Sequence, residues 1–101
     1  MTTVAADTIP GLDDSTLTRA LYSTDASLYR VVPQGVAHPR TVGELEAVVD
    51  AARVARVPLT TRGAGTSCAG NAVGPGVVVD VARHLTAIHA IDAEARTAVV
   101  D

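Results

Sequence analysis

The chain has 101 residues, with 8 Lys+Arg against 11 Asp+Glu, a formal net charge of -3 at pH 7, and 48% hydrophobic residues. This length accommodates one small domain, the apolar share excludes a disordered tail, and the acidic balance argues against a nucleic-acid partner. The apolar residues are mostly Ala and Val, with no Phe or Trp. A core of such small side chains buries little area per residue and would be marginal alone, which suggests an incomplete unit.

Targeting and redox features are few. The single cysteine, Cys68, excludes an internal disulfide. No apolar run approaches the roughly 18 residues that a membrane-spanning helix needs, and the first residues lack the basic start of a secretory leader. The sequence therefore predicts a cytoplasmic protein with no transmembrane segment.

The first third of the chain predicts little regular structure. Residues 1–12 are small and polar, and we expect them to form a flexible lead-in. Residues 13–34 predict a helical lead-in segment, with a short helix that Asp13 or Asp14 caps and that ends near Tyr22.

A longer helix has a clear start signal. Thr41 and Glu44 match a capping box, in which the Thr41 hydroxyl accepts a hydrogen bond from the Glu44 amide and the Glu44 carboxylate accepts one from the Thr41 amide. We expect a helix from residue 42 to about 56, because Pro58 stops it from running on. A short extended piece, residues 36–38, precedes it.

The remaining elements are strands. Residues 59–62 and 77–80 predict two strands, the second buried on both faces because it is a continuous apolar run. Residues 84–92 and 96–100 alternate apolar with polar around a turn at 93–95, which predicts an antiparallel hairpin. The fold class is therefore α/β (α+β): a small, mostly parallel sheet with flanking helices and a C-terminal hairpin that lacks a partner.

The densest glycine region follows the strand expected at residues 59–62. Closely spaced glycines expose successive backbone N–H groups, and such a nest binds anions, above all phosphate. A Walker A loop is excluded, because Asn71 and Ala72 stand where Lys and Ser/Thr are required and the chain has no lysine. A Rossmann fingerprint is disfavoured, because Gly74-Pro75-Gly76 interrupts the helix that should receive the pyrophosphate.

Other reactive side chains predict structural roles. Ser67 resembles a nucleophile elbow, but the glycines from Gly70 onward exclude the helix that such an elbow needs. The three histidines lack partners at metal-ligand spacing, so we predict no metal site. Asp80 is expected to close its strand by bonding nearby amides, and Cys68 to act as a small packing residue. No catalytic residue is predicted.

Several of these segments together resemble the start of the FAD-binding (PCMH-type) domain of the vanillyl-alcohol oxidase superfamily. Within it, the likeness is to the D-type subunit of glycolate oxidase and to D-lactate dehydrogenase, and residues 22–36 resemble the lead-in of the long form that is fused to an iron-sulfur domain. The resemblance implies that residues 35–101 are the incomplete N-terminal portion of that domain. The motifs are Pro39-Arg-Thr41, the capped helix, Val57 to Gly70, Val77-Val-Val-Asp80 and Ile91-Asp92.

The resemblance also implies a cofactor site. The loop would wrap the FAD pyrophosphate with backbone amides, assisted by the hydroxyls of Thr66 and Ser67. In relatives that attach flavin covalently a histidine stands where this chain has Thr66, so we expect FAD to be held without a covalent bond. Arg62 could equally be a surface or ion-paired residue, and Asn71 could bond the loop itself. The candidate cofactor-binding residues are Arg62, Gly63, Ala64, Gly65, Thr66, Ser67, Gly70 and Asn71.

The implied function is an FAD-linked oxidoreductase that oxidises a D-2-hydroxy acid such as lactate, glycolate or 2-hydroxyglutarate. Electrons would leave the flavin toward an iron-sulfur cluster or another acceptor, and the catalytic groups would lie in the rest of the same chain. The 101-residue chain is then expected to bind FAD weakly or not at all and to show no turnover. Two alternatives stay open: another branch of the superfamily, such as an aldonolactone or alditol oxidase or a reductase of cell-wall nucleotide sugars, and a non-enzymatic anion-binding or interaction module.

Overall fold

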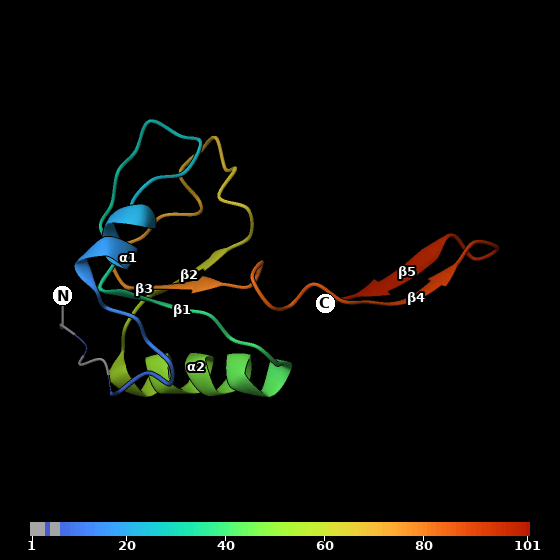
Figure 1. The fold of residues 1–101 in the computed structure, drawn as a ribbon, viewed down its shortest axis with the longest axis horizontal. Coiled ribbons are helices and arrows are strands. Elements are labelled where there is room, and N and C mark those ends of the chain that lie inside the picture. Colours follow the sequence, from blue (N-terminus) through green and yellow to red (C-terminus); the bar gives the residue numbers. More distant parts are fainter. Residues whose placement is uncertain (1–3, 5–6) are drawn as a thin grey trace.

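The computed structural model describes residue 4 and residues 7–101 of the chain (Figure 1). Residues 1–3 and 5–6, part of the lead-in expected to be flexible, lie outside the described part. The elements in chain order are α1 (Thr16–Leu21), β1 (Gly35–Ala37), α2 (Val42–Ala55), β2 (Leu59–Arg62), β3 (Val77–Asp80), β4 (Ile88–Asp92) and β5 (Thr97–Val100).

The central sheet has three parallel strands in the order β1-β3-β2. Val78 of β3 lies in register with Val36 of β1 on one side and with Thr60 of β2 on the other. Helix α2 covers one face of this sheet, and α1 with the loops lies over the other (Figure 1). All four residues of β3 are therefore buried, as its continuous apolar sequence predicts, and the α/β fold class is confirmed.

Helix α2 begins at the predicted capping box. The Thr41 Oγ1 accepts from the Glu44 backbone N–H at 3.1 Å. The Glu44 carboxylate accepts from the backbone N–H of Arg40 at 2.7 Å, one residue upstream of the predicted Thr41 amide. The helix ends at Ala55, and Arg56 adopts the left-handed conformation with φ 55° while its N–H bonds the carbonyls of the last turn. This αL cap ends the helix before Pro58 is reached.

The core lies between α2 and the sheet, and it includes the lead-in. Ile9 is 1% exposed and Val4 is 8% exposed, so these two side chains pack in the core, while the flexibility expected of residues 1–12 stays a prediction. The physical reason for this packing is that Ile9 is one of few large apolar side chains, and burying it stabilises by about 1.5–3 kcal/mol. The buried cluster comprises Val4, Ile9, Ala37, Val48, Ala52, Val57, Val77 and Val79.

The segment 13–34, expected to be a helical lead-in, is helical only over α1. Ser15 caps this helix, with its Oγ accepting from the Thr18 N–H, where Asp13 or Asp14 was expected. Asp13 instead forms an antiparallel bridge with Val36 through two backbone bonds of 2.9 Å each. The bridge fixes the backbone of Asp13 beside β1, so the cap passes to Ser15.

The β4–β5 hairpin extends away from the rest of the molecule (Figure 1). The predicted turn is present, but β4 begins at Ile88 and not at residue 84. Every residue of both strands is exposed. No other layer of the described structure covers the apolar side chains of this hairpin, which are Ile88, Ile91, Val99 and Val100.

Candidate functional site

The glycine loop begins where β2 ends, at the carboxyl edge of the sheet. Residues 63–76 contain no helix or strand. Gly65 and Gly70 have φ values of 70° and 84°, a region that side chains other than glycine rarely adopt. Gly74 has another reason to be glycine, because a Cβ there would collide with the Thr60 side chain of β2. The sequence predicts this glycine loop. The need for glycine at position 74 comes from packing against β2, which the spacing of the glycines does not reveal.

The loop surrounds a cavity of about 290 Å³. Six of the eight predicted cofactor-binding residues line it: Gly63, Ala64, Gly65, Thr66, Ser67 and Asn71. The other two lining residues are Thr61 and Ala72, so the described lining contains no carboxylate. The cavity thus presents backbone, hydroxyl and amide groups to an anion, with no carboxylate among its lining residues.

The loop is held in shape by a few side-chain oxygens. Ser67 Oγ accepts from the backbone N–H of Ala69 at 3.3 Å and of Asn71 at 3.0 Å. Asp25 accepts from the N–H of Ala72 at 3.2 Å. Within the described part of the chain, the N–H groups of residues 64–68 donate no hydrogen bond. These five donors are available to a ligand, as an anion nest requires.

Arg62 and Gly70 lie outside the cavity lining. The Arg62 guanidinium donates to the carbonyls of Thr24 at 2.8 Å and Ala72 at 3.2 Å. It also lies over the ring of Tyr22, with 5.0 Å from its central carbon to the ring centroid. Arg62 therefore fastens the loop to the lead-in. Gly70 leaves room for the ring of Tyr29, which a Cβ at this position would meet.

A partly buried polar cluster joins Tyr22, just after α1, to the ends of β1 and β3. The Tyr22 hydroxyl donates to the Asp80 carboxylate at 2.5 Å and lies 3.0 Å from His38 Nε2. Burial, followed by the hydrogen bond to Asp80, raises the pKa of Tyr22. Asp80 also accepts from the Ala82 N–H at 2.8 Å, which is the predicted strand-closing bond. The link to Tyr22 spans 58 positions, and no local sequence signal indicates it.

Two further properties concern the described residues. No helix among them is long and apolar enough to cross a bilayer. They contain no group of three or more His, Cys, Asp or Glu side chains arranged to hold a metal ion.

Comparisons with known proteins agree on one family. A family model described as an FAD binding domain matches residues 33–101. D-2-hydroxyglutarate dehydrogenases from Haemophilus influenzae and Escherichia coli are 31% and 34% identical to this chain over 81 and 79 residues. Glycolate oxidase subunit GlcD from Bacillus subtilis is 37% identical over 90 residues.

These alignments cover most of this chain and little of each relative. They span 77%, 75% and 87% of the chain but 8%, 8% and 19% of the three relatives. A solved structure of alkyldihydroxyacetonephosphate synthase matches with a TM-score of 0.74 and 21% identity, over 87% of this chain and 19% of that one. At this identity the likeness shows a shared fold.

Proposed function

Because the chain belongs to the FAD-binding domain family, whose cofactor is FAD, we propose that it supplies the pyrophosphate-binding loop of an oxidoreductase acting on a D-2-hydroxy acid. Residues 33–101, which the family model matches, contain the motifs from Pro39 to Asp92 on which the resemblance to the FAD-binding domain rests. The substrate class is supported by relatives named for 2-hydroxyglutarate and glycolate. An iron-sulfur domain stays a prediction.

The observation that carries this proposal is the row of free amides in the glycine loop. Residues 64–67 line a cavity that has no acidic side chain in its lining, and their backbone N–H groups, with that of the neighbouring Cys68, donate no hydrogen bond within the described residues. Backbone amides and hydroxyls favour a phosphate oxygen without any need for a lysine. The residues present therefore fit the pyrophosphate of FAD.

In this proposal, residues of this chain bind the FAD pyrophosphate and hold the loop in shape for it. The amides of residues 64–68 and the Thr66 hydroxyl donate to phosphate oxygens, while Ser67, Arg62 and Asp25 hold the loop rigid. A loop that is already shaped loses little conformational entropy when the ligand binds. Bound FAD would supply a hydride acceptor for the carbon that carries the substrate hydroxyl.

We propose that FAD is held here without a covalent bond. Thr66 occupies the position at which relatives with covalent flavin carry histidine, and a threonine hydroxyl is not a flavin-linking group. The chain spans 8% to 19% of the compared relatives, so the groups that contact the substrate and the flavin ring belong to the remainder of such an enzyme. Denaturing the flavin-loaded enzyme should release all of its flavin into the protein-free filtrate.

The test of the loop uses amide NMR shifts of the 101-residue chain during titration with FAD. We expect saturable shifts of the amides of residues 64–68 and weak affinity, since the chain supplies one part of the site. Thr66→Val keeps the side-chain shape and removes the hydroxyl, so it should weaken binding by about fivefold to tenfold. Thr97→Val, in the exposed strand β5, is the matched control and should leave affinity unchanged.

Two results would count against the proposal. Shifts that spread over the hairpin and spare residues 64–68 would place the flavin elsewhere. A loop that binds inorganic pyrophosphate as tightly as it binds FAD would favour a general anion-binding module.

A further inference from the structure

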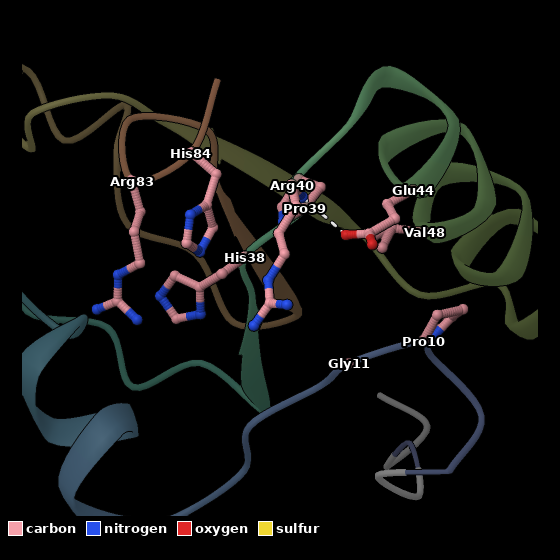
Figure 2. Close-up of a pocket in the computed structure, with 9 residues that line it drawn as sticks. All are labelled: Pro10, Gly11, His38, Pro39, Arg40, Glu44, Val48, Arg83 and His84. Atoms are coloured by element: carbon pink, nitrogen blue, oxygen red, sulfur yellow. Dashed lines mark hydrogen bonds between the residues drawn. The ribbon is translucent and has the colours of Figure 1, made fainter. Parts of the chain in front are cut away.

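A second and larger cavity opens at the carboxyl ends of β1 and β3. It has a volume of about 460 Å³ and shares no lining residue with the cavity of the glycine loop. Its walls come from the lead-in, the residues after β1, the start of α2 and the turn after β3 (Figure 2). The lining residues are Pro10, Gly11, His38, Pro39, Arg40, Glu44, Val48, Arg83 and His84.

Four basic side chains gather in this cavity. In Figure 2 the rings of His38 and His84 lie between the side chains of Arg83 and Arg40, and all four residues line the cavity. Within the described residues, the guanidinium groups of Arg40 and Arg83 make no hydrogen bond and no ion pair. Two guanidinium groups, ten N–H donors in total, therefore face the cavity unpaired.

Three acidic groups act near the cavity, Glu44, Asp80 and Asp13, and each accepts a hydrogen bond within the described residues, Asp13 from the Thr18 hydroxyl. Glu44, the one acidic lining residue, accepts the backbone N–H of Arg40 in the helix cap. Asp80 accepts from Tyr22 and lies 3.7 Å from His38 Nε2, so it faces the histidine from β3. Burial first, and then the positive charge of Arg83, lowers the pKa of His38. Positive charge thus outweighs negative charge among the lining side chains.

We propose that this cavity binds a small dianion with phosphate or carboxylate groups, at a site separate from the glycine loop. Arg40 and Arg83 approach it from two different chain segments, so each can give a forked pair of hydrogen bonds to one end of the ligand. His84 adds a ring nitrogen beside them, whereas His38 Nε2 is already engaged by the Tyr22 hydroxyl. A doubly charged ligand satisfies both guanidinium groups, which a neutral ligand or a monoanion does not.

The test follows the ring signals of His38 and His84 by NMR. The 101-residue chain is titrated at constant ionic strength with inorganic phosphate, with succinate and with chloride. We expect saturable shifts of both rings with phosphate or succinate, and none with chloride. Whichever dianion binds more tightly identifies the ligand class. If neither moves the rings, the proposal is wrong.

Variants distinguish a specific binding site from a general attraction of anions by positive charge. Arg40→Gln and Arg83→Gln should each weaken binding at least about tenfold, which is the loss of one charge-assisted interaction. Arg53→Gln is the matched control, since it removes the same charge from an exposed position of α2. Equal weakening in all three variants would overturn the proposal. Circular dichroism checks that the exposed substitutions leave the fold intact.

FAD distinguishes this site from the cofactor loop. If the cavity is separate, saturating FAD leaves the dianion affinity unchanged within about twofold, and Thr66→Val has no effect on it. Competition between FAD and the dianion would make the cavity part of the flavin site and would refute a second site. The phosphate and succinate titrations test the dianion site even where FAD does not bind the 101-residue chain.

Discussion

The clearest difference between sequence and structure is at Ile9, and its replacement by alanine is a quantitative test. A flexible lead-in predicts no effect on stability. In the structure Ile9 is 1% exposed and packs in the core with Val48, Ala52 and Val77. The change removes three carbons at about 0.8 kcal/mol each, and the cavity that remains adds to this loss. We therefore expect the free energy of unfolding to fall by about 3 kcal/mol.

Such a loss is large for this chain. A domain of this size with so light a core has a total stability near the low end of the usual range, about 5 kcal/mol. With a urea dependence of roughly 1 kcal/mol per molar, the urea midpoint of unfolding falls by about 3 M. Urea titration followed by far-UV circular dichroism measures it, because α2 supplies most of the helical signal.

Two variants calibrate the result. Ile9→Val removes one carbon and should cost about 1 kcal/mol. Ile91→Ala, on the exposed hairpin where the side chain is 73% exposed, should cost less than about 1 kcal/mol. If Ile9→Ala is no more destabilising than Ile91→Ala, the lead-in is not part of the core and the reasoning from burial fails.

Two further predictions concern the lead-in and the loop. Hydrogen bonds from the Thr18 hydroxyl and then from Ser15 lower the pKa of Asp13 from 3.8 to about 2. The Asp13 carboxylate therefore stabilises the fold fully above pH 3.8, and this stabilisation is lost as the pH falls toward 2. Carboxyl NMR titration should show this midpoint, and Thr18→Val should raise it; an unchanged midpoint would contradict the assignment. Arg62→Gln removes the hydrogen bonds to the carbonyls of Thr24 and Ala72, so the free energy of unfolding should fall by about 1–3 kcal/mol. Amide hydrogen exchange in the glycine loop should also become faster, and unaltered exchange would refute the anchoring role of Arg62.

The parts of the fold that the sequence predicts are those that local chemistry decides. The Thr41–Glu44 pair marks the start of α2, and a continuous run of valines marks β3 as a buried strand. The glycine loop is equally local, because the residues within it exclude a P-loop, which needs a lysine, and disfavour a Rossmann turn, which Gly74-Pro75-Gly76 interrupts. These features depend on residues within a few positions of one another.

The rest depends on contacts between distant segments. Nothing near Arg62 indicates that its guanidinium turns away from the loop cavity to bond Thr24. The Tyr22–Asp80 bond and the burial of Ile9 likewise need the assembled sheet. Arg83 and His38 come together for the same reason, since β1 and β3 place them at one edge. The positions of these residues in the sequence do not indicate that their side chains lie close together in the fold.

The strand order has a consequence for how the chain is made. Because β3 lies between β1 and β2, neither of the two earlier strands has a partner until the last of the three is available. As the protein leaves the ribosome, α2 can form early from its own local contacts, but no part of the parallel sheet can assemble. The glycine loop lies between β2 and β3, so the ligand-binding backbone takes its final shape in the same step that completes the sheet.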